Sequence, residues 1–321
     1  MTKSAIDRIY YTDYPGRTSD LLETRLEVAY LQSSERFQDI EFCGIVYSPN
    51  RSRNEQLIEI KEHPAVLLWG RGYEHDYSLS FEPKRGFKKL VIDVHQDAKT
   101  DDDLRRKIPN SCNHLIFSLK KERCKGVAVI GCDYMRVEGN ECITHGARHS
   151  NHGLIPDTKR AYFEAMASGR KIAFYSTPFA IEELERENSA LKFEKEALHI
   201  SLDLDGINGF RCHPGYVDRR LKKLDAKTAY DYLIQLMRPE RGNRLIRYDI
   251  GGLHIDDTDI PLLRRGEIDY HGFMRKYGKS LEMIEKFICI ALFGLIVHSR
   301  KDKVKFEREF SKIFDREDCT Y

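Results

Sequence analysis

The chain has 321 residues, with 53 basic and 51 acidic side chains, so its formal net charge is only +2 at pH 7. This balance gives no electrostatic case for binding to nucleic acid or to an anionic membrane surface. Hydrophobic residues make up 41% of the chain, which suits one sizeable α/β domain or two small ones.

Apolar runs typical of strands recur along the chain and alternate with helical patterns. The strand-like runs are residues 41–46, 65–69, 89–94, 126–131, 171–175, 198–204 and 245–250. The helical patterns are residues 114–122, 158–168, 181–194 and 226–237, and from about residue 270 the tail is predicted to be helical throughout. Strands that alternate with helices predict a parallel sheet covered on both faces.

The sequence also bears on location. The first residues lack the apolar core of a signal peptide, and the longest apolar run, residues 287–297, is too short to span a bilayer. The eight cysteines include no Cys-x-x-Cys pair, which favours reduced thiols over disulfides or a zinc–thiolate site. We therefore expect a cytoplasmic protein without a membrane partner.

The first polar motif follows the apolar run 65–70, where a glycine-containing turn presents His75. Ligands in parallel α/β sheets are commonly carried on loops at the carboxyl ends of strands. Alone, His75 is a weak indication of a site.

A second motif places Asp93, His95 and Asp97 at alternate positions after the apolar residues 90–92. Alternate side chains of a strand share a face, so these three side chains are expected to converge. A solvated strand edge is the ordinary alternative, but the preceding run is typical of a strand buried on both faces. Because buried carboxylates would repel one another, the motif predicts a cation site.

A third motif, residues 197–205, is another apolar run that ends in two carboxylates, Asp203 and Asp205, at strand spacing. A strand that runs into a turn at Gly206 is the ordinary explanation of one such run. Two such strand ends in one chain are harder to explain in this way. The carboxyl ends of parallel strands meet at one edge of a sheet, so we expect the three motifs to converge there.

Together the motifs resemble the signature of the ureohydrolase superfamily of arginases and agmatinases: Gly72-x-x-His75, Asp93-x-His95-x-Asp97 and Ser201-x-Asp203-x-Asp205. Glu74 stands where the family usually has aspartate, and Asn208-Gly209 replaces the usual Asp-Pro. The chain thus resembles a remote branch, and the peptide arginases are the nearest in pattern. The resemblance implies one domain over residues 1–321, a three-layer α/β/α sandwich around a mostly parallel, roughly eight-stranded sheet.

The resemblance also implies a centre of two Mn²⁺ ions. One ion would be held by His75, Asp93, Asp97 and Asp203, and the second by Asp93, His95, Asp203 and Asp205. Asp93 and Asp203 would then bridge the two ions. A donor set rich in carboxylates favours Mn²⁺ over Zn²⁺, and Fe or Co could substitute.

The implied reaction is hydrolysis of a guanidinium group to urea and an amine. Asp97 would orient the attacking hydroxide, and His114 would shuttle a proton, since an imidazole titrates near neutral pH. A helix-capping segment beginning at Asn110 is the ordinary explanation of the residues before His114, and cap and shuttle are compatible. Asn110 and His145 are candidate substrate contacts, although a plain surface loop explains His145 equally well.

A guanidinium substrate needs a carboxylate partner, for which Asp249 is the first candidate and Asp256 the second. An ordinary turn at the strand end is the alternative for Asp249. The acidic triplet of residues 101–103 disfavours a substrate with a free carboxylate. Both a peptide-embedded arginine, which would become ornithine, and agmatine satisfy this condition, and we modestly prefer the peptide.

Other functions stay open. They are a small-molecule ureohydrolase of agmatinase type, a deacetylase-type amide hydrolase with one zinc ion, and a non-enzymatic interaction protein stabilised by metal. The sequence does not determine the oligomeric state, and a homo-oligomer is compatible with it.

Overall fold

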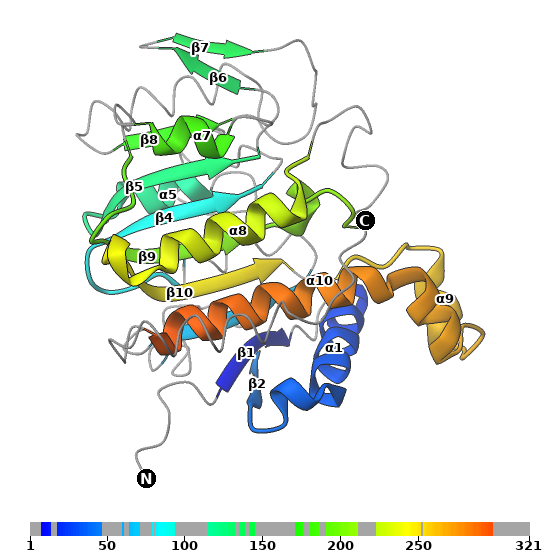
Figure 1. The fold of residues 1–321 in the computed structure, drawn as a ribbon. Helices are drawn as coiled ribbons and strands as arrows, with labels where there is room; N and C mark the ends of the chain where they lie inside the picture. Colours follow the sequence, from blue (N-terminus) through cyan, green and yellow to red (C-terminus); the bar gives the residue numbers. More distant parts are fainter. Residues whose placement is uncertain are drawn as a thin grey trace.

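The computed structural model describes residues 8–13, 18–46, 60, 64–70, 79, 81–93, 114–131, 135–138, 141–144, 171–175, 180–186, 191–210, 223–251 and 253–297. Among them, eight strands form one sheet in the order β2-β1-β3-β10-β9-β4-β5-β8 (Figure 1). Every pairing between neighbours in this sheet is parallel. The mostly parallel, roughly eight-stranded sheet is therefore confirmed.

The strands of this sheet are short and deeply buried at its centre, as expected when both faces are covered. All five residues of β3 are buried. The strands are β1 (Arg8–Asp13), β2 (Glu41–Val46), β3 (Ala65–Trp69), β4 (Phe87–Ile92), β5 (Cys124–Ile130), β8 (Lys171–Tyr175), β9 (Ala197–Leu202) and β10 (Arg244–Gly251). A separate antiparallel pair joins β6 (Met135–Glu138) to β7 (Glu141–Thr144).

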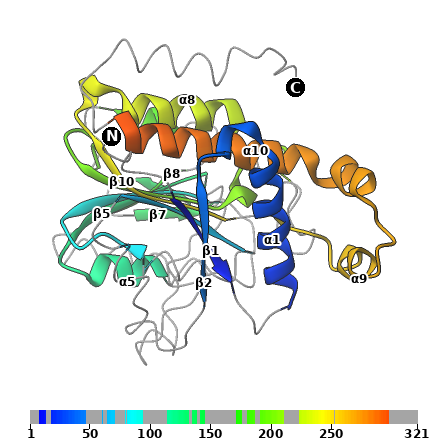
Figure 2. The ribbon, with the colours of Figure 1, turned by 90° about the horizontal axis from the view of Figure 1, so that it is seen from below.

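Helices cover both faces, which confirms the three-layer sandwich. Figure 2 shows α8 and α10 along one face of the sheet and α5 on the opposite face. The described helices are α1 (Thr18–Ser33), α5 (His114–Lys120), α7 (Ala180–Glu185), α8 (Ala226–Met237), α9 (Asp259–Arg264) and α10 (Tyr270–Val297), with 3-10 turns η1 (Glu35–Phe37), η4 (Leu204–Gly206) and η5 (Pro239–Arg241).

The two faces of the sheet differ in chemistry. On the face under α8 and α10, the alternate residues of the central strands join one large apolar core, which includes Leu90, Ile92, Ile200 and Ile250. The intervening residues of the same strands, including Lys89 and His199, point to the face that α5 covers. The polar side chains of these strands therefore lie on the α5 face.

The packing of α10 on α8 is unusually close at one point. A Cβ atom at Gly294 would lie only 1.9 Å from the Met237 sulfur, so a larger residue there would force the Met237 side chain to move. The start of α10 at Tyr270 confirms the predicted helical tail as far as Val297, and residues 298–321 lie outside the described part.

Most differences from the predicted elements are at their ends. The runs at 41–46, 65–69, 171–175 and 226–237 match their elements in full. The helix predicted at 181–194 is wrong in extent, because α7 ends at Glu185 and the described residues 191–194 are irregular. The helix predicted at 158–168 lies outside the described residues. Strand β1, helix α1 and the hairpin of β6 and β7 were not predicted.

Within the described part of the chain, no helix is both long enough and apolar enough to cross a membrane. Two cysteines of this part, Cys124 and Cys289, are free thiols. Burial raises the pKa of the Cys124 thiol to about 12, so it is an unreactive core group.

Candidate metal centre

Two neighbouring central strands end in carboxylates. Strand β4 ends at Ile92 and is followed by Asp93, and strand β9 ends at Leu202 and is followed by Asp203. The Asp203 N–H donates to the Ile92 carbonyl at 2.8 Å, and the Asp93 N–H donates to the Ile130 carbonyl at 3.1 Å. The sheet ladder thus continues past the strands and fixes the backbone of both aspartates at the carboxyl edge.

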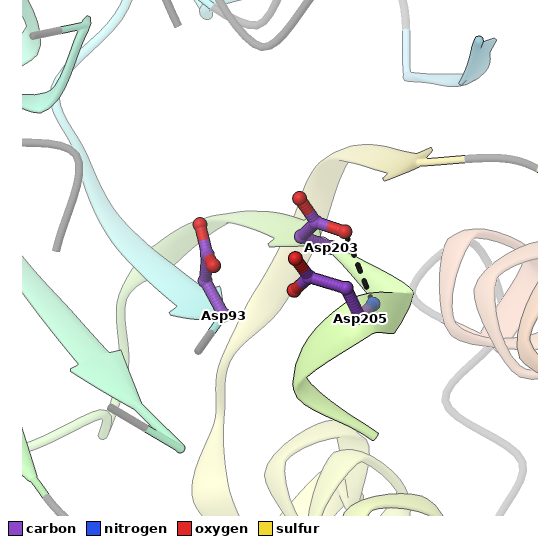
Figure 3. A group of neighbouring side chains, drawn as sticks. All are labelled: Asp93, Asp203 and Asp205. Carbon is purple, nitrogen blue, oxygen red and sulfur yellow. Dashed lines mark hydrogen bonds between the residues drawn. The ribbon is translucent and has the colours of Figure 1, made fainter. Parts of the chain in front are cut away.

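Asp205 reaches the same place through a tight turn. Asp203 is the N-cap of the 3-10 turn η4, and its Oδ1 accepts the Asp205 N–H at 3.1 Å. The prediction that Asp205 continues the strand is therefore wrong, although the prediction that it lies beside Asp203 is correct. Figure 3 shows the Asp205 carboxylate turned towards Asp93.

The three aspartates form a compact anionic group. Each offers one carboxylate oxygen, and these oxygens lie within 4.8 Å of one another. Asp93 is fully buried and Asp203 is 9% exposed. Three carboxylates so close together, two of them poorly hydrated, repel one another unless a cation joins them, and oxygen donors of this kind suit Mn²⁺. The described donor set therefore fits a divalent metal.

Several predicted site residues lie outside the described residues. They are His75, His95, Asp97, Asn110 and His145, and their roles remain predictions. Among the described residues, the structure brings together the three remaining predicted ligands.

His114 is the first residue of α5 and is fully buried. Helix α5 leads into β5 through a turn in which the Cys124 N–H donates to the Lys121 carbonyl, so α5 runs back from the carboxyl edge of the sheet. In the same helix, Ser118 hydrogen-bonds to Glu82, which pairs with Lys89 of β4. His114 therefore starts a helix on the face of the sheet that Asp93 shares, and its role as a proton shuttle remains a prediction.

The two predicted guanidinium partners both have protein partners. Asp249 is fully buried, and its Oδ1 accepts hydrogen bonds from Trp69 Nε1 at 2.9 Å and from Ser201 Oγ at 2.6 Å. Its Oδ2 contacts His199 Nε2. The Asp256 carboxylate pairs with Lys276 at 3.1 Å. These contacts argue against a direct substrate bond from Asp249.

A buried charge cluster under the site was missed by sequence reasoning. Lys89 and Glu82 are both fully buried, with Nζ and Oε1 3.7 Å apart, and Lys121 donates to Glu82 at 2.6 Å. Burial raises the pKa of Glu82, but the charges of Lys121 and Lys89 outweigh it, so the pKa lies below its usual value. The available signal was the spacing of the two residues: Lys89 stands four residues before Asp93, and His199 stands two residues before Ser201 and four before Asp203, on the same strand faces.

Comparisons with known proteins support the fold. No protein-family model matches the chain, and no curated protein sequence matches it. The similar solved structures include three that match nearly the whole chain. Trypanosoma cruzi formiminoglutamase with Mn²⁺ has a TM-score of 0.52 at 11% sequence identity, and the match covers 90% of this chain and 94% of the formiminoglutamase chain. Agmatine ureohydrolase of Thermoplasma volcanium has a TM-score of 0.52 at 13% identity, with coverages of 95% and 92%. Helicobacter pylori arginase has a TM-score of 0.51 at 11% identity, with coverages of 90% and 99%.

At this level of identity the comparison concerns the fold alone. The chain has the α/β/α fold of arginase, agmatine ureohydrolase and formiminoglutamase. Its carboxylate group lies outside the carboxyl ends of central strands, where parallel sheets generally place their sites.

Proposed function

We propose that the protein is a manganese-dependent hydrolase of the ureohydrolase superfamily, which cleaves a guanidinium group to urea and an amine. The observation that carries the proposal is the convergence of Asp93, Asp203 and Asp205 at the carboxyl edge of β4 and β9. The shared fold with a formiminoglutamase solved with Mn²⁺ supports the same assignment.

Asp93 and Asp203 would be the central ligands of the proposed metal centre. Asp93 and Asp203 follow the neighbouring strands β4 and β9. The Asp203 N–H donates to the carbonyl of Ile92, the residue before Asp93, so the two backbones are held side by side. They therefore stand on opposite sides of one space, with Asp205 beside Asp203 (Figure 3). His75, His95 and Asp97 complete the proposed donor set. Two Mn²⁺ ions held by these residues would lower the pKa of water enough to make a nucleophile available near neutral pH.

The protein's own side chains would then orient the nucleophile and move a proton. Asp97 is proposed to hold the attacking nucleophile by a hydrogen bond. His114 is proposed to deliver a proton to the departing amine, because its helix begins at the carboxyl edge on the face that Asp93 shares. Burial of His114 keeps bulk water away from the proton path.

For the substrate we propose an arginine side chain within a peptide, which is converted to ornithine. The acidic triplet at residues 101–103 supports a substrate without a free carboxylate next to the guanidinium-bearing chain. Agmatine meets the same condition and is the second candidate. Free arginine carries the disfavoured carboxylate.

The test incubates the purified protein and Mn²⁺ with arginine-containing peptides, agmatine and free arginine. Urea release is measured for all three, and mass spectrometry detects loss of CH₂N₂ from the peptides. Asp93→Asn should abolish urea release while far-ultraviolet circular dichroism is unchanged, and Asp231→Asn, an exposed surface change, serves as the matched control. Urea from no substrate, or the same urea output from Asp93→Asn, would overturn the proposal.

Metal analysis separates the proposal from a deacetylase-type enzyme. Two equivalents of Mn²⁺ per chain are expected. One tightly held equivalent of Zn²⁺, with no activity gained from Mn²⁺, would favour the amide hydrolase instead.

A further inference from the structure

A polar row lies directly beneath the carboxylate group on the α5 face of the sheet. Asp249 of β10 pairs in register with Ser201 of β9, which in turn pairs with Val91 of β4. Since side chains alternate, Ser201 lies one step inward from Asp203 on the same face. Asp249 therefore stands one row below the proposed metal ligands, on the neighbouring strand.

The Asp249 carboxylate joins three strands at this depth. It accepts from Trp69 of β3 at 2.9 Å and from Ser201 of β9 at 2.6 Å, and it contacts His199 of β9. All four side chains are at most 1% exposed. Such fully buried hydrogen bonds to a carboxylate are directional and costly to break.

The electrostatics of the network favour the ionised form of Asp249. Burial lowers the pKa of His199, the Asp249 charge opposes this effect, and His199 Nε2 contacts the Asp249 carboxylate. Burial alone would raise the pKa of Asp249, but His199, the Lys89 charge and the Ser201 hydroxyl together hold it below its ordinary value. Asp249 is thus an ionised carboxylate with its donors in place.

Trp69 links this network to the edge of the site. It pairs in register with Gly251, and a Cβ at Gly251 would lie 2.4 Å from the ring atom Cη2 of Trp69. The indole therefore lies on the end of β10. Ile250, the residue before Gly251, pairs with Leu202 of β9, so the end of β10 lies beside Asp203.

We propose that Asp249 is a positioning residue for the metal centre, which acts through Ser201 to fix the end of β9 and through Trp69 to fix the neighbouring end of β10, and so aims the Asp203 and Asp205 carboxylates. This inference rests on the proposed metal-dependent function. It gives Asp249 a different task from the guanidinium contact that the sequence suggested. Groups that orient metal ligands without touching the metal commonly change metal affinity by roughly tenfold to a hundredfold.

The test measures Mn²⁺ binding to the metal-stripped full chain by electron paramagnetic resonance, which counts free Mn²⁺. Asp249→Asn keeps the shape of the side chain and should weaken Mn²⁺ binding by roughly tenfold or more. It should lower kcat more than it changes KM for the substrate. Asp231→Asn, on the exposed surface of α8, should bind Mn²⁺ as the unaltered protein does.

Trp69 supplies a second readout, because it is the only tryptophan of the chain. Mn²⁺ should quench the Trp69 fluorescence in the unaltered protein. The quenching should reach its maximum at the same Mn²⁺ concentration at which the metal sites are filled. Ser201→Ala removes one hydrogen bond and should weaken Mn²⁺ binding by about threefold to tenfold while the fold is retained. If Asp249→Asn fails to fold, the Mn²⁺ affinity of Ser201→Ala tests whether the network positions the metal ligands.

The outcomes separate this inference from the proposed function. If Asp249→Asn binds Mn²⁺ normally and only raises KM, Asp249 is a substrate contact and the inference fails, whereas the proposed function stands. If both variants match the unaltered protein in Mn²⁺ affinity and kinetics, the network is only core packing. Weakened Mn²⁺ binding in a protein that releases no urea from any substrate would support the inference and refute the proposed function. Absence of Mn²⁺ binding by the unaltered protein would refute both.

Discussion

Glu27 offers a direct test of how burial controls stability in this protein. It lies on α1 with no exposed surface, and its Oε2 accepts the backbone N–H of Leu253 at 3.2 Å. One helical turn earlier, Glu23 accepts the N–H of Ile255 at 2.6 Å. The two glutamates thus hold the segment that follows β10, and the His254 ring lies 3.9 Å from Glu23.

Burial raises the pKa of Glu27 from 4.5 to about 8, the Leu253 hydrogen bond opposes this, and the Glu23 charge adds to it. Glu27 is therefore protonated in the folded protein at neutral pH and ionised in the unfolded chain. Its contribution to stability is fully present below about pH 4.5 and is lost as the pH rises towards 8. The loss approaches 1.4 kcal/mol per pH unit, or about 5 kcal/mol over the whole window.

Glutamine has the shape of a protonated glutamate and keeps the acceptor for Leu253. The Glu27→Gln variant should therefore lack this loss and become more stable than the unaltered protein between pH 7 and 8.5, by about 3 to 5 kcal/mol. Urea unfolding at pH 5.5, 7.0 and 8.5 measures the difference. Glu182→Gln, at an exposed position of α7, is the matched control and should be neutral. Equal pH slopes for Glu27→Gln and the unaltered protein would refute the reasoning.

Three further predictions concern the site and the face beneath it. Asp205→Asn should reduce bound Mn²⁺ from two equivalents to one without loss of helix content, since the Asp203 cap is retained; metal analysis with circular dichroism checks this. Glu82→Gln removes the carboxylate that pairs with the buried Lys89 and should cost about 3 to 5 kcal/mol in chemical unfolding, and an unchanged midpoint would contradict this. Gly251→Ala drives a methyl group into the Trp69 ring and should shift its fluorescence and lower the melting temperature, whereas an unshifted spectrum would show that the ring has room to move.

The central sheet was predictable because its strands are continuous apolar runs. Residues 65–69 and 171–175 match β3 and β8 from end to end. β1 was missed, since its sequence from Arg8 to Asp13 carries charges at both ends and has no long apolar run. α1 was missed for a related reason: its buried residues include Glu23 and Glu27, so the apolar stripe of a typical amphipathic helix is interrupted.

The site was predictable in outline but not in geometry. Strand alternation correctly brings Asp93 and Asp203 to one face, because both follow neighbouring parallel strands in register. The same rule fails for Asp205, where the Asp203 side chain captures a backbone N–H and starts a 3-10 turn. A side-chain cap of this kind overrides periodicity, and the sequence shows it only as an aspartate followed two residues later by another.

The polar face of the sheet buries several charged side chains beside the strands that carry the site. Arg247 is 2% exposed and donates to the carbonyls of Phe81 and Ile60, at 2.9 and 2.5 Å, so a full charge is buried with backbone partners. Lys89 and Glu82 neutralise each other on the same face. These groups contribute little net stability compared with apolar side chains of equal size, but they permit few alternative arrangements. The apolar face under α8 and α10 therefore stabilises the fold, and the charged face under α5 fixes the strand ends to which Asp93 and Asp203 belong.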